Sequence, residues 1–187
     1  EGGTLKRTVE LLKDKRVKRI GAEDGVLSYA DFEKIRLLLE DSAELLTGAG
    51  KLLSDMRAVK DKAELEKIGA AQKITDAAFE HILSVMTPNM TEREVALELE
   101  FFMRRAGAQA MAFDVIAVSG GASALPHGVP RNMKLERGFL TMDFGAMLDG
   151  YCSDMTRTVV IGRADSEMKR LYNTVLTAQQ AALDALA

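Results

Sequence analysis

Over the first 57 residues, the apolar and polar positions alternate between short helical and short strand-like segments. An apolar stripe with helical spacing, formed by Leu5, Val9 and Leu12, predicts a first helix. Ser28 and Asp31 have the spacing of a capping box and predict the start of a second helix. Residues 17–22 and 43–46 predict two short strands. Because two strands are too few for a stable sheet, we interpret residues 1–57 as the C-terminal part of an α/β domain.

From residue 58 the pattern changes to long helices followed by strands. Capping boxes at Asp61 with Glu64 and at Thr91 with Glu94 predict where two helices begin. Their buried stripes are expected to consist of Leu65, Ile68, Ala71, Ala78, Phe79, Ile82 and Met86 in the first helix, and of Val95, Leu99, Phe102, Met103 and Ala106 in the second. Strands are predicted at residues 115–118, 139–148 and 151–161. We therefore expect an α+β fold, with residues 58–187 forming a second domain.

The dipeptide Asp149-Gly150 between two strand-like runs is a strong signal for a two-residue hairpin turn. In such a hairpin Leu148 lies opposite Tyr151, so Asp143 lies opposite Thr156 and Asp154 lies opposite Gly145. Side chains alternate along a strand with period two, which places both aspartates on one face. As diagonal neighbours, their Cα atoms are expected to lie roughly 7–8 Å apart.

Two carboxylates this close repel each other and lose hydration when they are partly buried, unless a proton, a basic side chain or a cation intervenes. Divalent metal ions with a preference for oxygen ligands suit such a pair. Gly145 is expected to leave room between the carboxylates, and Arg157 is expected to point to the other face. The alternative from spacing alone is that both aspartates are ordinary solvent-facing charges.

Three further side chains are candidates for chemistry. His127 lies in the loop of residues 119–130, where its imidazole could act as an acid or base or bind a substrate oxygen. The alternative is a turn histidine bonded to backbone. His81 is expected to be a surface or boundary residue of a helix. Cys152 shares a predicted face with Asp154, so it is either a thiolate ligand or, by our preferred interpretation, a small buried apolar residue.

Composition narrows the function classes. The chain has 187 residues with 25 basic and 28 acidic side chains, a net charge of −3, which argues against a dedicated nucleic-acid-binding protein. No apolar run reaches the roughly 20 residues of a transmembrane helix, so no membrane partner is expected. A single cysteine cannot form an internal disulfide, which favours the cytoplasm as the compartment.

The strand and loop residues resemble a known family. The motifs are Phe113-Asp114-Val115-Ile116, Ser119-Gly120, Ala124-Leu125-Pro126-His127-Gly128-Val129-Pro130, Met142-Asp143-Phe144-Gly145-Ala146 and Gly150-Tyr151-Cys152-Ser153-Asp154-Met155-Thr156-Arg157-Thr158. Over residues 57–162 they resemble the Xaa-Pro aminopeptidases and Xaa-Pro dipeptidases (prolidases) of the pita-bread metallopeptidases. The resemblance implies the first half of a pita-bread catalytic domain preceded by the end of the family's N-terminal domain.

The resemblance also implies roles for the candidate residues. Asp143 and Asp154 would be the first two ligands of a dinuclear centre that holds Mn or Co, with Zn possible. His127 would contact the substrate, a peptide with proline in the second position, and assist proton movement. Relatives are commonly homodimers, so a homodimer is expected.

Some residues depart from the family pattern. The family completes its metal site with one His and two Glu further downstream, but only Glu167 is present after Asp154. We therefore expect this chain, incomplete at both ends, to bind metal weakly and to be inactive by itself. Arg131 after the His-Gly-Val-Pro run is expected to affect substrate fit. The alternatives are a non-catalytic pita-bread binding protein and a creatinase-like C–N hydrolase.

Overall fold

The computed structural model describes residues 3–186, and the chain divides after Asp61 into two compact units. The first unit contains α1 (Thr4–Asp14), β1 (Arg19–Gly21), α2 (Tyr29–Leu39), β2 (Glu44–Leu46) and α3 (Ala49–Ala58). Strands β1 and β2 pair in parallel, with Ile20 opposite Leu45. Helix α2 begins where predicted, because the Ser28 hydroxyl accepts a hydrogen bond from the Asp31 backbone N–H.

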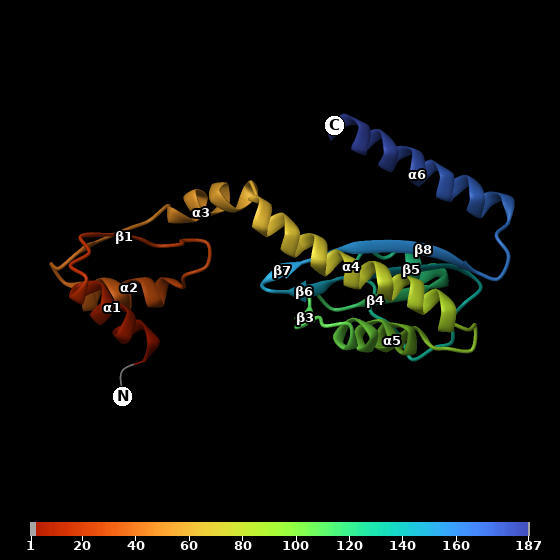
Figure 1. Cartoon of the computed structure of the whole chain (residues 1–187), viewed down its shortest axis with the longest axis horizontal. Coiled ribbons are helices and arrows are strands. Elements are labelled where there is room, and N and C mark those ends of the chain that lie inside the picture. The colour runs from red at the N-terminus through yellow and green to blue at the C-terminus, as the bar shows by residue number, and fades with distance from the viewer. Residues whose placement is uncertain (1–2, 187) are drawn as a thin grey trace. The chain divides into compact units, whose positions relative to one another are not determined.

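The second unit has two three-stranded antiparallel sheets beside two long helices (Figure 1). Its elements are α4 (Lys62–Val85), α5 (Glu92–Arg105), β3 (Ala110–Met111), β4 (Ile116–Ser119), the short 3-10 helix η1 (Gly120–Ala124), β5 (Gly138–Phe144), β6 (Ala146–Leu148), β7 (Tyr151–Cys152), β8 (Met155–Ile161) and α6 (Ser166–Leu186). The sheets have the strand orders β3-β6-β7 and β4-β5-β8. The α+β class expected from the sequence is confirmed.

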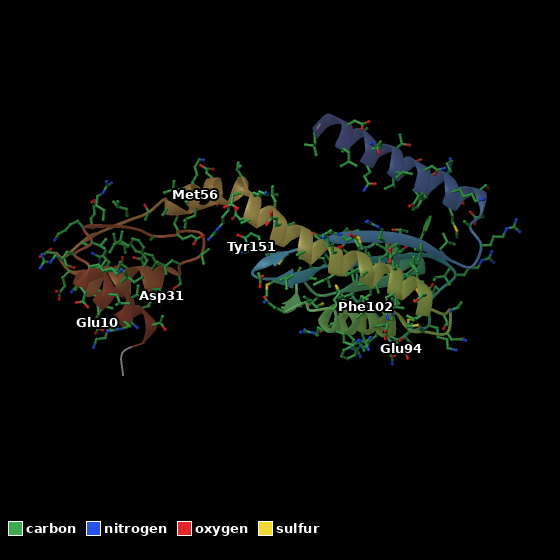
Figure 2. All side chains as sticks on the ribbon, viewed as in Figure 1. Glu10, Asp31, Met56, Glu94, Phe102 and Tyr151 are labelled. Atoms are coloured by element: carbon green, nitrogen blue, oxygen red, sulfur yellow. The ribbon has the colours of Figure 1, made fainter. Side chains whose placement is uncertain are left out.

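Helix α5 begins at the capping box that the sequence predicts. The Thr91 hydroxyl accepts from the Glu94 backbone N–H, and the Glu94 carboxylate accepts from the Thr91 backbone N–H at 2.6 Å (Figure 2). The predicted stripes are largely correct, because Ala71, Ala78, Ile82, Val95, Leu99 and Met103 are fully buried. Leu65, by contrast, is 58% exposed, and Ala106, just past the end of α5, is also exposed.

The strands of the second unit have one face packed on helices and one face turned away from them. Along β5, Leu140, Met142 and Phe144 are completely buried in the core with residues of α4 and α5, while the residues between them are half-buried. Pairing places Val118, Thr141, Asp143, Thr156 and Thr158 together on the opposite face. We call this the aspartate face.

The predicted hairpin register is confirmed, although each predicted long strand is interrupted. Leu148 pairs with Tyr151, and Asp143 pairs with Thr156, as expected from a two-residue turn at Asp149-Gly150. The expected strands 139–148 and 151–161 are each split in two, around Gly145 and Ser153.

The Ser153 side chain explains the interruption. Its hydroxyl accepts a hydrogen bond from the Ala146 backbone N–H at 2.9 Å and lies 2.5 Å from the Thr75 hydroxyl of α4. A side chain thus replaces a backbone partner in the ladder, while the Ser153 N–H still donates to the Ala146 carbonyl at 2.9 Å. The register therefore continues across the interruption without a slip.

Helix α6 has an apolar side that no other element of residues 3–186 covers. Leu171, Val175, Leu183 and Leu186 are each at least 55% exposed. Among the described residues, no helix has both the length and the hydropathy needed to span a bilayer.

Candidate metal centre

The first predicted ligand, Asp143, lies near the end of β5 on the aspartate face. The Thr156 hydroxyl, directly across on β8, donates a hydrogen bond to Asp143 Oδ1 at 2.9 Å. Asp154 comes two residues before Thr156, and the two-residue strand period assigns it to the same face. Asp143 is half-buried, whereas Asp154 is exposed, so the expectation of partial burial is wrong for Asp154.

Hydroxyl groups lie on the face that bears Asp143. None of the ion pairs formed among residues 3–186 includes Asp143 or Asp154. The Thr141 and Thr158 hydroxyls lie 3.3 Å apart on the same face. Arg157 has the opposite orientation, as predicted, with its guanidinium carbon 5.8 Å from the Phe79 ring centroid. The negative charges on this face are therefore not neutralised by a neighbouring cation of the described chain.

Two carboxylates and nearby hydroxyls are oxygen donors, which fits a hard or borderline divalent cation. Within the part of the chain that the structure describes, no three His, Cys, Asp or Glu side chains gather into a metal-binding group. No third side chain of these types therefore joins the two aspartates within residues 3–186.

Gly145 has a different role from the one predicted. A Cβ atom at this position would lie 2.0 Å from the Ser153 carbonyl oxygen and 3.1 Å from Ala112 Cβ. The place that a Gly145 side chain would take is thus filled by main chain, so the glycine does not leave an empty space at that point. Gly145 is required because Ser153 approaches the β5–β6 junction so closely.

The loop that carries His127 packs onto the aspartate face. His127 itself is exposed, but the next residue, Gly128, is buried. A Cβ atom on Gly128 would lie 2.9 Å from Val118 Cγ1, so the loop backbone rests directly on that side chain. Since Val118 lies opposite Thr141, the structure brings the His127 loop to the face of the sheet that bears Asp143.

A buried glutamate beneath this loop was not predicted. Glu92, the first residue of α5, is fully buried. Its Oε1 accepts hydrogen bonds from the Ser119 N–H, the Ser119 hydroxyl and Arg131 Nη2 at 2.7, 2.8 and 2.6 Å. Its Oε2 accepts from the Arg131 N–H and Nε at 2.9 and 2.8 Å. Both carboxylate oxygens are thus satisfied without water.

These hydrogen bonds determine the charge state of Glu92. Burial alone would raise its pKa, but the donors of Arg131 and Ser119 outweigh burial and lower the pKa from 4.5 to about 2. Hydrogen bonding to Glu92 likewise raises the pKa of the Arg131 guanidinium. The pair is therefore an ionised, bidentate salt bridge with one partner wholly removed from solvent.

Arg131, which follows the His-Gly-Val-Pro run, binds groups of its own chain. The structure directs its guanidinium to Glu92, to the Ser119 carbonyl at 3.2 Å and to Glu136 at 3.1 Å. The expectation that Arg131 affects substrate fit stays a prediction. Sequence gives little warning of this network, because a glutamate in the first turn of a helix usually faces solvent and favours the helix dipole.

The other two candidates are also placed by the structure. Cys152 is exposed, so the preferred interpretation as a buried apolar residue is wrong. His81 is a boundary residue, as expected: its Nε2 lies 2.6 Å from Glu98 Oε1, and its ring stacks on Phe102 at 4.4 Å between centroids. This position joins α4 to α5, away from the aspartate face.

The low pKa of Glu92 predicts acid sensitivity. Because the folded-state pKa is below the unfolded-state value, its contribution to stability is complete above pH 4.5 and is lost as the pH falls toward 2. The full linkage corresponds to about 3 kcal/mol. Urea unfolding of the wild-type chain between pH 2 and 6 should show this loss, and the Glu92→Gln variant should show a flatter dependence. An equally steep dependence in the variant would contradict the assignment.

With this geometry established, the comparisons with known proteins identify the family. The model of metallopeptidase family M24 matches residues 66–187, and the chain belongs to that family. Its mixed helix and sheet structure matches the pita-bread fold of solved Xaa-Pro peptidases, which confirms the resemblance seen in the sequence.

Individual relatives agree with this assignment. The chain is 40% identical over 179 residues to an uncharacterized peptidase of Bacillus subtilis, YqhT, covering 95% of this chain and 50% of that protein. It is 37% identical to an Xaa-Pro dipeptidase of Pyrococcus furiosus, covering 94% and 49%. Among solved structures, an X-Pro aminopeptidase from Thermotoga maritima superposes with a TM-score of 0.87 at 37% identity, covering 98% and 52%. The chain thus spans about half the length of these relatives.

Proposed function

We propose that this chain is the part of an Xaa-Pro peptidase that supplies the first two metal ligands, in a protein that hydrolyses the peptide bond between an N-terminal residue and proline. The proposal is supported above all by the register that pairs Asp143 with Thr156, from which the strand period assigns Asp154 to the same face. None of the ion pairs among residues 3–186 includes either aspartate. Relatives named Xaa-Pro dipeptidase and X-Pro aminopeptidase support the substrate class.

Asp143 and Asp154 would hold a divalent cation through carboxylate oxygens. We propose a dinuclear site with Mn or Co, or alternatively Zn, whose remaining ligands come from outside these residues. When bound, such ions supply Lewis acidity toward the scissile carbonyl and lower the pKa of a bound water. Thr156 contributes by donating its hydroxyl to Asp143 Oδ1, which orients that carboxylate.

His127 is proposed to contact the substrate. It is exposed, it lies one residue before a glycine packed on Val118, and its loop covers the aspartate face. An imidazole in this place can donate to a substrate oxygen or transfer a proton at neutral pH.

Three broader features complete the proposal. A substrate peptide with proline in the second position, rather than a nucleic acid or a membrane, fits the net charge of −3 and the family. A cytoplasmic location is proposed from the single cysteine. A homodimer is proposed from the family resemblance.

A test of this proposal must supply the metal ligands that lie outside residues 1–187. Residues 1–187 would be joined to the second half of the B. subtilis relative, and hydrolysis of Xaa-Pro dipeptides and longer Xaa-Pro peptides would be measured with Mn and Co. The expected result is metal-dependent cleavage that is lost in Asp143→Asn and Asp154→Asn. This chain alone is expected to show no turnover.

A matched control comes from the same hairpin. Asp149 has a φ of +51°, which asparagine tolerates well, and its Oδ1 accepts from Gln109 at 3.1 Å, a bond that asparagine keeps. Asp149→Asn should therefore retain full activity. A folded chimera that binds Mn without cleaving any Xaa-Pro peptide would overturn the proposal in favour of a binding protein. Cleavage of a non-peptide C–N substrate alone would favour the creatinase-like alternative.

A further inference from the structure

The segment from η1 to Arg131 is held at three points. At its beginning, the Ser123 hydroxyl donates to the Gly120 carbonyl at 2.7 Å and the Leu125 N–H donates to the Ala122 carbonyl at 3.0 Å. In its middle, Gly128 rests on Val118. Three residues further on, Arg131 binds the buried Glu92.

The attachment at Arg131 differs from the other two in strength and in reach. Its guanidinium makes a bidentate, charge-assisted contact with a carboxylate that is fully buried, and such contacts are among the strongest hydrogen bonds in proteins. The same guanidinium also reaches the Ser119 carbonyl at the end of β4 and the Glu136 carboxylate. The Arg131 side chain thus connects the loop to α5, to β4 and to Glu136, which lies two residues before β5.

The remaining loop surface is poorly held. Leu125 and Val129 are 59% and 77% exposed, and His127 is exposed between them. An exposed loop with few buried contacts is held in place mainly by its ends and by the Gly128 contact. Three residues lie between His127 and Arg131. The Arg131 backbone is also held, because its N–H donates to Glu92 Oε2 at 2.9 Å and its carbonyl accepts from the Arg93 N–H at 3.2 Å. Loss of the guanidinium contacts would therefore loosen the segment that carries the imidazole rather than detach it.

We propose that Arg131 is a positioning residue for His127: by binding buried Glu92, it presses Gly128 onto Val118 and thereby holds the imidazole over the aspartate face. The functional part of this inference rests on the proposed role of His127. The mechanical part, that Arg131 orders the loop, stands on the contacts alone.

The loop can be observed directly by NMR on the isotope-labelled chain, without metal or substrate. In the wild type we expect NOE contacts between the Gly128 α-protons and the Val118 methyl groups, and backbone order parameters of about 0.85 at residues 127–129. In Arg131→Gln these NOE contacts should disappear and the order parameters should fall below about 0.6. The signals of β5 should be unchanged, which separates a positioning role from general loss of stability.

Two further variants make the test specific. Arg131→Lys keeps a positive charge but loses the bidentate fork, so it should restore the NOE contacts in part, and it replaces the Gln variant if that variant does not fold. Arg104→Gln removes another Arg–Glu pair of α5, the exposed one with Glu100, and should leave the loop as in the wild type. Persistence of the Gly128–Val118 contacts and of loop order in both Arg131 variants would overturn the inference.

The outcome is independent of the peptidase assay. If Arg131→Gln loses loop order and the chimera cleaves no Xaa-Pro peptide, the inference that Arg131 orders the loop is supported and the proposed function is contradicted. An ordered loop in Arg131→Gln together with an active chimera would do the reverse.

Discussion

Replacing Glu92 with Gln is expected to lower the free energy of unfolding by about 3–5 kcal/mol, the usual cost of removing one partner of a buried ion pair. The amide places an N–H group among the five donor contacts from Arg131 and Ser119 and leaves the guanidinium without its counter-charge. Urea unfolding followed by circular dichroism at pH 7 measures the change.

Glu100 provides the control for this substitution. It lies on the same helix and pairs with Arg104 at 2.9 Å, but both side chains are partly exposed. Glu100→Gln should cost no more than about 0.5 kcal/mol, as is common for exposed pairs four residues apart. Equal stability of the Glu92 and Glu100 variants would contradict the assignment of Glu92 as a buried carboxylate bonded to Arg131 and Ser119.

Gly145→Ala is expected to destabilise the second unit by about 3 kcal/mol or more, because the added methyl group would overlap a backbone oxygen rather than a movable side chain. The methyl carbon would lie 2.0 Å from the Ser153 carbonyl oxygen. Relief requires the β6–β7 segment to move, which breaks the Ser153 hydrogen bonds to Ala146. Thermal unfolding would record the loss as a lower Tm.

Gly69 in α4 offers a control of opposite sign. A Cβ atom there meets nothing within 4 Å, and alanine is favoured over glycine inside a helix by about 1 kcal/mol. Gly69→Ala should therefore be neutral or stabilising. A Gly145→Ala variant with wild-type Tm would show that Ser153 does not approach Gly145 as closely as the structure indicates.

Features that depend on neighbouring residues were predictable from the sequence. The Asp149-Gly150 turn determines the hairpin register, because the turn type alone decides which residues face each other. The start of α5 was predictable for the same reason, since Thr91 and Glu94 satisfy each other's backbone N–H groups. The face shared by Asp143 and Thr156 follows from these local rules.

Features that depend on distant residues were not predictable. Ser153 interrupts its strand by bonding with Thr75, which is 78 positions away in sequence. Glu92 is buried because Ser119 and Arg131, 27 and 39 positions away, converge on it. Cys152 was expected to be a small buried apolar residue, as free cysteines usually are, but it is exposed together with Asp154 and Thr156, with which it alternates in burial. Whether a polar group is buried depends on which distant residues bind it in the fold. The local sequence pattern around the group does not contain this information.

Paramagnetic mapping with Mn²⁺ on the labelled chain shows whether the two aspartates share a cation. Weak binding is expected, with line broadening centred on Asp143, Asp154 and Thr156 that disappears in Asp143→Asn and in Asp154→Asn and persists in Asp149→Asn. Broadening centred elsewhere, or unchanged when both Asp143 and Asp154 are replaced by Asn, would contradict a metal site on this face of the sheet.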